Sequence, residues 1–453
     1  MQASRKRFWW ILIAVLGVLV VVAVTAVVIV GKRTAVGSPQ SPPPLRLPQQ
    51  ELLSASMRKE PVPGWRTSAH DLGLPPGTVP KLIRGYENRG YLLGITGTGW
   101  WLAAVDVTNG RSVFPPVELG LAKTASGVDC FVDGPSMVLC IVQDRDPAMP
   151  SRAWLVNADS GALLYDGPTE LRLTTTQREP VVEQAGVYAV ATVNGEGVHG
   201  IGLRTELTWF VPGSGLLSQQ RDWQHDTPPQ PIAVQGGAAS SPADVVFSVA
   251  DGRVVKPTVP QAEQLGLAFA YPGGFGYEYS SSDGYTWDRV ALFDSSGRNL
   301  GASDLKGTIL TGSRDIPLVQ GTTSDVVFTL DGRKLLELPK STAMPYTRVI
   351  GDRLLVEAGQ DRERSWQQFD LRTGKALKTC DVEGLGYYYI ASDGDVAVIS
   401  GDRTPARAID LDTCEQLWSF PGETQSEGKD VWRVDTTLVQ RTNDELFSLV
   451  APS

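Results

Sequence analysis

The feature that most constrains the fold is a short motif that recurs along the chain. Each copy has an apolar run of strand-forming residues, then Asp or Asn, a short spacer and, in most copies, a Ser, Thr or Asn followed by Gly. The copies lie at 104–114, 156–165, 293–300, 369–377 and 408–418, and a second repeated pair lies at 241–253 and 323–333. Asp370 and Asp410 are 40 residues apart, and Asp244 and Asp325 are 81 residues apart, which is two such periods. A period near 40 residues built from strands alone predicts a β-propeller.

The repeated polar residues have a structural explanation. An Asp or Asn side chain can accept hydrogen bonds from backbone N–H groups of a tight turn, and Gly adopts the positive φ that such a turn requires. In three copies an aromatic residue follows four positions after the glycine position, where we expect it to pack between neighbouring blades. The residues to which we assign this structural role are Asp106, Gly110, Asn157, Gly161, Asp294, Gly297, Asp370, Gly374, Asp410 and Trp418.

The repeats resemble those of the pyrroloquinoline-quinone-like (PQQ-like) β-propellers, whose motif is A-x-D-x-x-T-G-x-x-x-W. The stretch AIDLDTCEQLW at 408–418 matches it with Cys414 in place of the glycine, and AVDVTNGRSVF at 104–114 matches with Asn109 and Phe114 substituted. The resemblance covers roughly residues 75–450. It implies the propeller fold and says little about activity.

Turn markers favour eight blades over seven. The markers lie near Asp106, Asn157, Val211, Asp251, Asp294, Asp331, Asp370 and Asp410, and the terminal hairpin at 436–450 would add one more. We therefore predict an all-β fold, a β-propeller of four-stranded blades with one transmembrane helix before it. The resemblance to this class of propeller implies that closure uses a strand near Trp65 in the last blade. The segment 50–59 is expected to add a helical turn or two.

The N-terminal part of the sequence predicts a membrane anchor. Residues 8–30 form an uncharged apolar run, long enough to span a bilayer as a helix. Three basic residues precede it and two follow it, which favours an N-in orientation. We predict a cytoplasmic N-terminus at 1–7, the helix at 8–30, a proline-rich linker at 31–64 and the propeller at 65–453, outside the cytoplasm and tethered to the plasma membrane. A cleaved signal peptide is the alternative.

Four cysteines form two plausible pairs. Cys130 and Cys140 flank an Asp-Gly-Pro-Ser turn and fall opposite each other on a predicted hairpin, within reach of a disulfide. Cys380 and Cys414 remain as the second pair, which would join adjacent blades. An even number of cysteines fits an oxidising compartment. Four buried thiols in a reducing compartment are the alternative.

Charge argues against nucleic acid as a partner. The net charge is −9, and the five basic residues before position 34 leave 36 basic against 50 acidic residues in the remainder. So acidic a domain does not bind nucleic acid or anionic lipid by general electrostatics.

Motifs for chemistry are weak. The G-x-G-x-x-G match at 195–200 precedes an apparent strand instead of the helix that a dinucleotide site needs. The stretch 281–287 resembles an Asp box, which is a turn device. Three scattered histidines give no metal pattern, so neither a catalytic residue nor a metal or cofactor site is assigned. The tyrosines at 387–389 alternate between strand faces, so one ring is expected to face the axis or a blade.

The sequence therefore predicts a non-catalytic module, with no cofactor, that binds a protein or a cell-envelope polymer. The alternative is a PQQ-dependent oxidoreductase or a small-ligand sensor that uses the axial channel. Quinoprotein dehydrogenases carry a pair of adjacent cysteines, and no two cysteines are neighbours in this sequence.

Overall fold

The computed structural model describes residues 44–97, 99–121, 125–146, 149–174, 178–218, 226–238, 243–258, 264–280, 287–301, 305–309, 313, 315–340, 346–358, 365–386, 388–401, 404–421 and 429–453. The chain divides into two compact units, Met1–Leu45 and Arg46–Ser453, and every strand lies in the second unit. The predicted transmembrane helix at 8–30 lies outside the described residues. The residues that are described contain no helix that is long and apolar enough to cross a bilayer.

Within the described ranges the strands form nine antiparallel sheets, which we number in chain order. Sheet 1 contains β2 (Val79–Tyr86), β3 (Arg89–Ile95), β4 (Gly99–Asp106) and β5 (Arg111–Leu121); sheet 2 contains β6 (Ala125–Val132), β7 (Met137–Asp144), β8 (Ser151–Asn157) and β9 (Leu163–Thr169); sheet 3 contains β10 (Val181–Ala185), β11 (Tyr188–Val193), β12 (Gly197–Ile201) and β13 (Leu207–Pro212). Sheet 4 contains β14 (Ile232–Gln235) and β15 (Val245–Ser248); sheet 5 contains β16 (Gln264–Tyr271), β17 (Gly274–Ser280), β18 (Trp287–Asp294) and β19 (Leu305–Lys306); sheet 6 contains β20 (Thr308–Ile309), β21 (Leu318–Gln320), β22 (Ser324–Phe328) and β23 (Lys334–Pro339). Sheet 7 contains β24 (Thr347–Ile350), β25 (Arg353–Ala358), β26 (Ser365–Asp370) and β27 (Ala376–Cys380); sheet 8 contains β28 (Tyr389–Ser392), β29 (Val396–Gly401), β30 (Thr404–Asp410) and β31 (Gln416–Ser419); sheet 9 contains β32 (Lys429–Val434), β33 (Thr437–Thr442), β34 (Glu445–Val450) and β1 (Val62–Ser68).

The predicted all-β propeller is confirmed, with eight four-stranded sheets. The ninth, sheet 4, has two strands. Single bridges on either side, Leu217 to Gln235 and Phe247 to Val254, continue its hydrogen bonding in the manner of a first and a fourth strand. Sheet 4 therefore takes the place of a blade between sheets 3 and 5.

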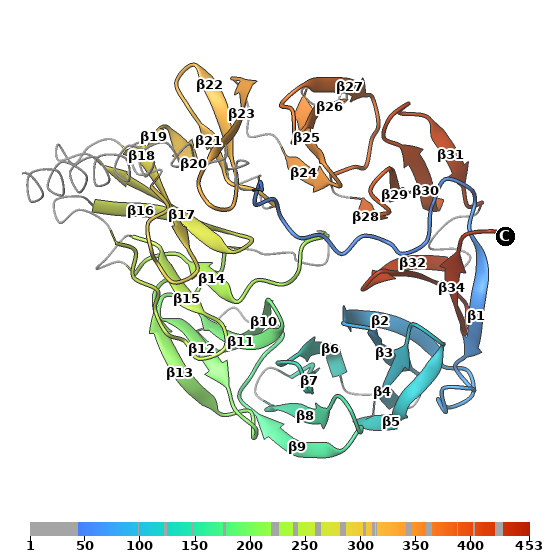
Figure 1. The fold of residues 1–453 in the computed structure, drawn as a ribbon. Helices are drawn as coiled ribbons and strands as arrows, with labels where there is room; N and C mark the ends of the chain where they lie inside the picture. Colours follow the sequence, from blue (N-terminus) through green and yellow to red (C-terminus); the bar gives the residue numbers. More distant parts are fainter. Residues whose placement is uncertain are drawn as a thin grey trace, which may run out of the picture. The chain divides into compact units, whose positions relative to one another are not determined.

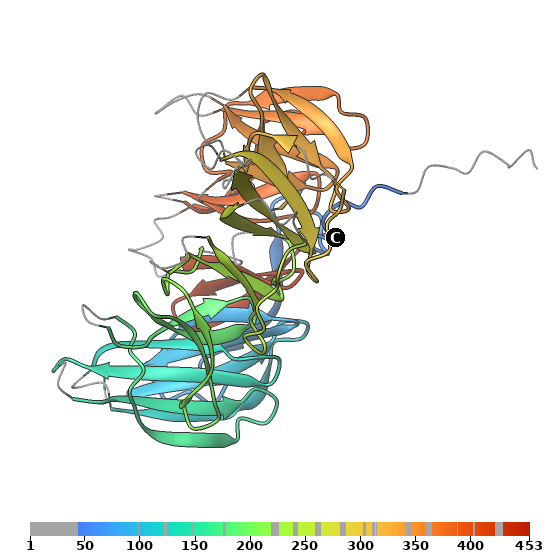
Figure 2. The same ribbon diagram turned by 90° about the vertical axis from the view of Figure 1, so that its left-hand side faces the viewer.

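The sheets succeed one another around a ring (Figure 1). The first strand of a sheet contacts the first strand of the next at several junctions, among them β2 with β6, β28 with β32 and β32 with β2, as expected for strands near the axis. Figure 2 shows the strands of sheets 1 to 3, coloured blue to green, as stacked layers. The twisted sheets thus pack face to face, and neither face can be buried without a neighbour.

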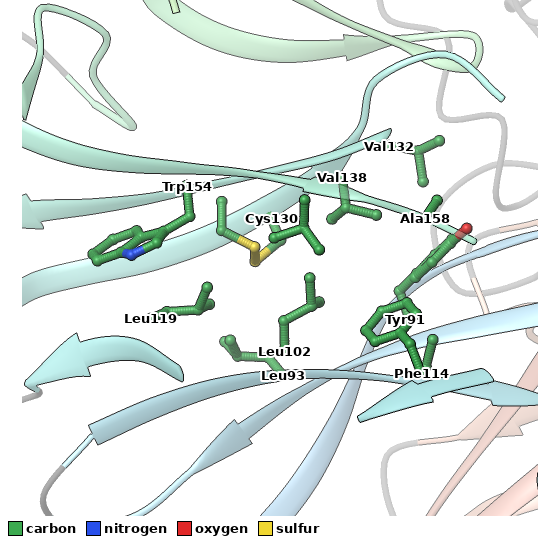
Figure 3. Close-up of a cluster of buried hydrophobic side chains, with 13 residues drawn as sticks. Tyr91, Leu93, Leu102, Phe114, Leu119, Cys130, Val132, Val138, Trp154 and Ala158 are labelled. Atoms are coloured by element: carbon green, nitrogen blue, oxygen red, sulfur yellow. A yellow bond between two sulfur atoms is a disulfide. The ribbon is translucent and has the colours of Figure 1, made fainter. Parts of the chain in front are cut away.

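The hydrophobic core is divided among the junctions between sheets. Nine clusters of buried side chains lie one at each junction, including the junction of sheet 9 with sheet 1 that closes the ring. Figure 3 shows the junction of sheets 1 and 2, where Leu102 and Phe114 face Cys130 and Trp154 across the gap. Apolar burial at every junction, including those of sheet 4, makes the closed ring the stable unit.

Ring closure uses β1, which contains Trp65, as the resemblance to PQQ-like propellers implies. β1 pairs antiparallel with β34, with Val62 opposite Val450 and Thr67 opposite Leu446. A strand from the start of the unit therefore completes its last sheet.

The expected helical turn at 50–59 is wrong. Residues 46–61 are extended and cross the turns of the ring before β1 begins. Their backbone groups bond to the propeller; for example, the Leu53 N–H donates to the carbonyl of Ser392 at 2.8 Å. Because the ring satisfies these groups, the segment does not need helical hydrogen bonds. We call residues 46–61 the strap.

Candidate functional site

The predicted turn residues lie at the corners between the third and fourth strands of the sheets. At Asp106, the carboxylate accepts hydrogen bonds from the backbone N–H of Thr108 at 2.9 Å and from its hydroxyl at 2.6 Å. The Gly110 N–H donates to the Asp106 carbonyl at 2.8 Å, and Gly110 has a φ of 75°. The same bond to the carbonyl closes the corners at Asn157–Gly161, Asp294–Gly297 and Asp370–Gly374.

Corner glycines also receive a side chain from the preceding sheet. A Cβ on Gly161 would lie 2.7 Å from the ring of Phe114, which is on β5 of sheet 1. A Cβ on Gly110 would lie 2.5 Å from the ring of Trp65 on β1. Gly is therefore needed at these corners for both its φ and its lack of a side chain.

One corner uses a disulfide instead. Cys414 occupies the glycine position of sheet 8 with a φ of 62°, and its N–H donates to the Asp410 carbonyl at 2.8 Å. It is bonded to Cys380 at the end of β27 in sheet 7, so the predicted link between adjacent blades is present. Trp418, on β31, donates its indole N–H to the carbonyl of Met57 at 2.7 Å and thereby packs against the strap.

The second predicted disulfide, Cys130 to Cys140, is also present. The two residues are direct cross-strand partners on β6 and β7, and both are buried. It closes a hairpin within sheet 2.

The corner of sheet 3 is not at Val211. Val211 lies inside β13, and the corner is formed by residues 202–206, where Thr205 has a φ of 64°. The Thr205 N–H donates back to the Gly202 carbonyl at 2.9 Å, as the glycine N–H does at the other corners, but without Asp and Gly in the usual places. The match at 195–200 continues into β12, which is a strand, as the sequence predicts.

A group of buried polar side chains lies at the first strands of sheets 7 to 9. Asp226 is 3% exposed, and its carboxylate accepts hydrogen bonds from the Tyr389 hydroxyl and, at 3.0 Å, from the Arg433 guanidinium. Tyr389 is on β28 and Arg433 on β32. In Figure 1 the green segment before β14, which contains Asp226, runs towards the middle of the ring. We call Asp226, Arg348, Tyr389 and Arg433 the axial cluster.

Arg348, on β24, completes the cluster. Its guanidinium carbon lies 3.8 Å from the centre of the Tyr389 ring, and its Nε donates to the Leu385 carbonyl at 3.0 Å. A guanidinium over the face of an aromatic ring is a favourable cation–π contact. The cluster thus brings together the first strands of sheets 7, 8 and 9, and Asp226 from the segment before β14 bonds to two of them.

Burial dominates the electrostatics of the cluster. Desolvation raises the pKa of Asp226, and the charge of Arg433 and the hydrogen bond from Tyr389 offset this in part. Burial likewise raises the pKa of Tyr389 well above its usual value, and the nearby charge of Asp226 adds to the effect. Paired charges with hydrogen-bonded partners are what a buried polar network requires.

The cluster is suited to holding sheets together. Its carboxylate and its hydroxyl are bonded to each other, and one of the two arginines pairs with the acid while the other covers the ring. Among the described residues no group of three or more His, Cys, Asp or Glu side chains could hold a metal ion. Because its polar groups pair with one another across three sheets, we assign the cluster a structural role.

Further acids lie on the first strands of sheets 2 and 3. Asp129, on β6, is exposed, yet its pKa is raised because the surrounding protein desolvates it, with Lys81 and Arg84 acting in the opposite direction. Glu183, on β10, has a pKa raised by burial, and its carboxylate accepts a hydrogen bond from the Thr192 hydroxyl at 3.0 Å. The first strands of sheets 2 and 3 thus carry acidic side chains, as the first strands of sheets 7 to 9 carry the polar side chains of the axial cluster.

Sequence reasoning did not find the axial cluster. Asp226 precedes Tyr389 by 163 positions and Arg433 by 207. The one available signal was the run of tyrosines at 387–389, of which Tyr389 is in the cluster.

Comparisons with known proteins agree with the ring architecture. Residues 38–452 match the model of a family described as "Conjugation-associated 9-bladed beta-propeller domain". A relative from Mycolicibacterium smegmatis (strain MKD8), an "uncharacterized protein", is 33% identical, and the match covers 99% of this chain and 97% of that protein.

Solved structures with a similar fold are more distant. They include BamB from Moraxella catarrhalis, at 12% identity and a TM-score of 0.32 over 86% of this chain and 97% of that one. The C-terminal WD40 domain of Sif2 is 9% identical, with a TM-score of 0.36 over 83% and 99%. Likeness at this level carries no argument about function.

Proposed function

Because the chain belongs to the conjugation-associated nine-bladed β-propeller family, we propose that it is a non-catalytic binding module of a conjugation apparatus in the cell envelope. Its partner in this proposal is a protein. The acidic balance of the sequence, −9 overall, does not favour direct contact with DNA.

The observation that carries the proposal is a concentration of exposed apolar side chains at the outer edges of sheets 2 and 3. Leu163 and Leu164 on β9 are 47% and 50% exposed, and Phe210 on β13 is 49% exposed. Leu203, at the neighbouring corner, is 58% exposed, and Leu207 on β13 is 39% exposed. Apolar side chains gathered on a surface mark contact with other proteins. We call these five residues the outer apolar edge.

The edge strands add a second property. β9 and β13 are the last strands of their sheets, so one side of each backbone has no strand partner within its sheet. An edge strand can pair with a segment of another protein, and side chains on alternate positions then give specificity. By contrast, the outer strand β27 of sheet 7 has one large exposed apolar side chain, Leu377 at 40%.

The proposal places the propeller outside the cytoplasm on a membrane tether. Two disulfides support an oxidising compartment. The apolar run at 8–30 and the proline-rich stretch after it supply the proposed anchor and linker. The kinship with PQQ-like propellers, suggested by the motif at 408–418, also remains part of the proposal, without its enzymatic chemistry.

Site-specific photo-cross-linking in native membranes tests the partner. A photoreactive residue at position 164 or 210 should give a discrete cross-linked protein, and one at position 377, a matched exposed position on another outer strand, should not. Equal products from all three positions, or none from 164 and 210, would reject the outer apolar edge as the contact surface.

Protease accessibility tests the location. Protease added to spheroplasts should cut within residues 31–45 and release a fragment that contains the propeller. Full protection until the membrane is dissolved would refute the extracytoplasmic placement, whatever the outcome of cross-linking.

A further inference from the structure

The strap crosses four sheets of the ring before β1 begins. At its start, the Leu330 N–H of sheet 6 donates to the Arg46 carbonyl at 2.9 Å. The amide of Gln50 then forms two hydrogen bonds with the backbone of Gly351 in sheet 7, at 2.9 and 2.8 Å. Each contact is with a turn of the ring, so the strap lies along one face of successive sheets.

Two apolar side chains anchor the strap at sheets 8 and 9. Leu53 is 6% exposed and Met57 is 0% exposed, and both belong to the core cluster between these sheets. The Met57 carbonyl accepts the hydrogen bond from the Trp418 indole, and the Met57 N–H donates to the Asp393 carboxylate at 2.7 Å. The strap therefore docks as a bound peptide does, with buried side chains and paired backbone groups.

The strap also holds the axial cluster. The Glu51 N–H donates to the backbone carbonyl of Asp226 at 2.6 Å. One nitrogen of Arg433, Nη1, donates both to the Glu51 carbonyl at 3.1 Å and to the Asp226 carboxylate at 3.0 Å. Asp226 is thus fixed from two sides, by the strap at its backbone and by Tyr389 and Arg433 at its side chain.

We propose that the strap is a clasp for the axial cluster, so that undocking of the strap and release of Asp226 from the first strands of sheets 8 and 9 are a single conformational transition. Asp226 is an intramolecular ligand of Tyr389 and Arg433. Undocking of the strap at Glu51 would break two hydrogen bonds, the one from its N–H to the Asp226 carbonyl and the one from Arg433 to its own carbonyl. A buried carboxylate is stable only while its partners remain.

Coupling of this kind is reciprocal. If the docked strap favours buried Asp226, then buried Asp226 favours the docked strap by the same free energy. Perturbing either end should therefore loosen the other, although Met57 packs between sheets 8 and 9 and Asp226 bonds to Tyr389 and Arg433. A strap that merely covers the ring would not show this reciprocity.

Hydrogen–deuterium exchange of the full-length chain, read by mass spectrometry, tests the forward direction. Met57→Ser removes a buried apolar anchor from the strap. Exchange should accelerate by about tenfold or more, equivalent to about 1.4 kcal/mol, in peptides covering 50–57 and also in those covering 226–235, which include the paired amides of β14, the first strand after Asp226. Met149→Ser, at a residue 51% exposed, is the matched control and should change neither.

The reverse direction uses Asp226→Asn, which keeps the shape of the side chain and removes its charge. Exchange in peptides covering 50–57 should rise, while β11 and β12 of sheet 3 stay protected. Faster exchange at 50–57 without any change at 226–235 in Met57→Ser would overturn the proposal. Unchanged exchange at 50–57 in Met57→Ser would also overturn it. So would unchanged exchange at 50–57 in Asp226→Asn, and this second result decides the matter if Met57→Ser does not fold.

Discussion

The two disulfides of this propeller stabilise very different places. Cys130–Cys140 closes a hairpin within sheet 2, between residues that already pair across β6 and β7. Cys380–Cys414 joins sheet 7 to the corner of sheet 8, where other corners pack a side chain on a glycine. The Cys130–Cys140 disulfide links two strands that the hairpin turn already connects, whereas the Cys380–Cys414 disulfide links two different sheets. At the junction of sheets 7 and 8, a covalent bond therefore replaces the packing of a side chain on a corner glycine.

The acids beside these disulfides differ as well. Asp133, in the hairpin turn of sheet 2, is 6% exposed, and burial raises its pKa to about 6. At Asp410, burial acts to raise the pKa, but hydrogen bonds from the backbone N–H groups of Thr413 and Asp412 and the charge of Arg58 lower it overall. The hairpin and the joint should therefore respond to pH in opposite ways.

Removing the disulfides should have the largest effects. Cys380→Ala with Cys414→Ala opens a loop of 34 residues, and Cys130→Ala with Cys140→Ala opens a loop of 10. In the chain-entropy description the free energy of unfolding should fall by about 4 kcal/mol for the first pair and about 3 kcal/mol for the second. Chemical denaturation at pH 7 measures both. A larger loss from the hairpin pair would reverse the comparison.

Glycine at position 414 refines this result. Cys380→Ala with Cys414→Gly also lacks the disulfide, but it relieves the positive φ of 62° at position 414. It should be more stable than the double alanine variant by about 1 kcal/mol. No recovery would mean that the backbone of this corner relaxes once the disulfide is gone.

The junction of sheets 1 and 2 tests the alternative form of joint. Gly161→Ala would bring a Cβ to 2.7 Å from Phe114 at a φ of 70°, whereas Gly195→Ala, at a φ of 79°, has nothing within 4 Å. Denaturation should show a loss of about 3 kcal/mol for Gly161→Ala and about 1 kcal/mol for Gly195→Ala, since only the first combines backbone strain with overpacking. Similar losses would show that contact with Phe114 does not matter.

The pH dependence of the hairpin follows from Asp133. Because its pKa is raised from 3.8 to about 6 on folding, its contribution favours the folded state below pH 3.8 and is lost as pH rises through about 6. Asp133→Asn should match the parent near pH 3.5 and exceed its stability by about 2–3 kcal/mol at pH 7, from a shift of about two units. A constant difference across this range would contradict the assignment.

The joint should show the opposite sign. Because the pKa of Asp410 is lowered on folding, its contribution is present above pH 3.8 and is lost as pH falls through the lowered value. Asp410→Asn should be less stable than the parent at pH 7 and approach it below pH 3. Denaturation curves in which the gap widens towards low pH would refute this.

The smallest effect is expected at an exposed corner. Asp106→Asn places in sheet 1 the residue that sheet 2 uses at Asn157, whose side-chain oxygen accepts hydrogen bonds from Ser160 at 2.9 and 2.8 Å. The free energy of unfolding should change by less than about 0.5 kcal/mol. A loss above 1 kcal/mol would mean that this corner needs the second carboxylate oxygen, which accepts a hydrogen bond from the Asn109 side chain at 2.9 Å, or its charge.

Local signals were sufficient for the fold because the repeat is local. The corner residues and both disulfides follow from spacing and alternation within a few tens of residues, whereas the closing strand near Trp65 was expected from the resemblance to PQQ-like propellers. The eight markers together with the terminal hairpin correspond to the nine sheets, although sheet 4 has only two strands. Val211 misled because the corner of sheet 3 uses Thr205 at positive φ, which no turn rule favours.

The axial cluster could not be predicted in this way. Asp226 reaches Tyr389 and Arg433 only because the ring closes, and no period or motif relates the three positions. The strap shows the same limit, since Leu53 and Met57 are buried by sheets 8 and 9, whose strands begin more than 300 residues later. Contacts made by closure depend on the geometry of the whole ring.

Peptide mapping of the protein isolated from its native membranes, under non-reducing conditions with free thiols blocked at lysis, tests the central claim most directly. We expect two linked peptide pairs, Cys130 with Cys140 and Cys380 with Cys414, and no blocked cysteine. Blocked thiols at Cys380 and Cys414 in the native protein would contradict a covalent joint between sheets 7 and 8 and the oxidising compartment proposed for it.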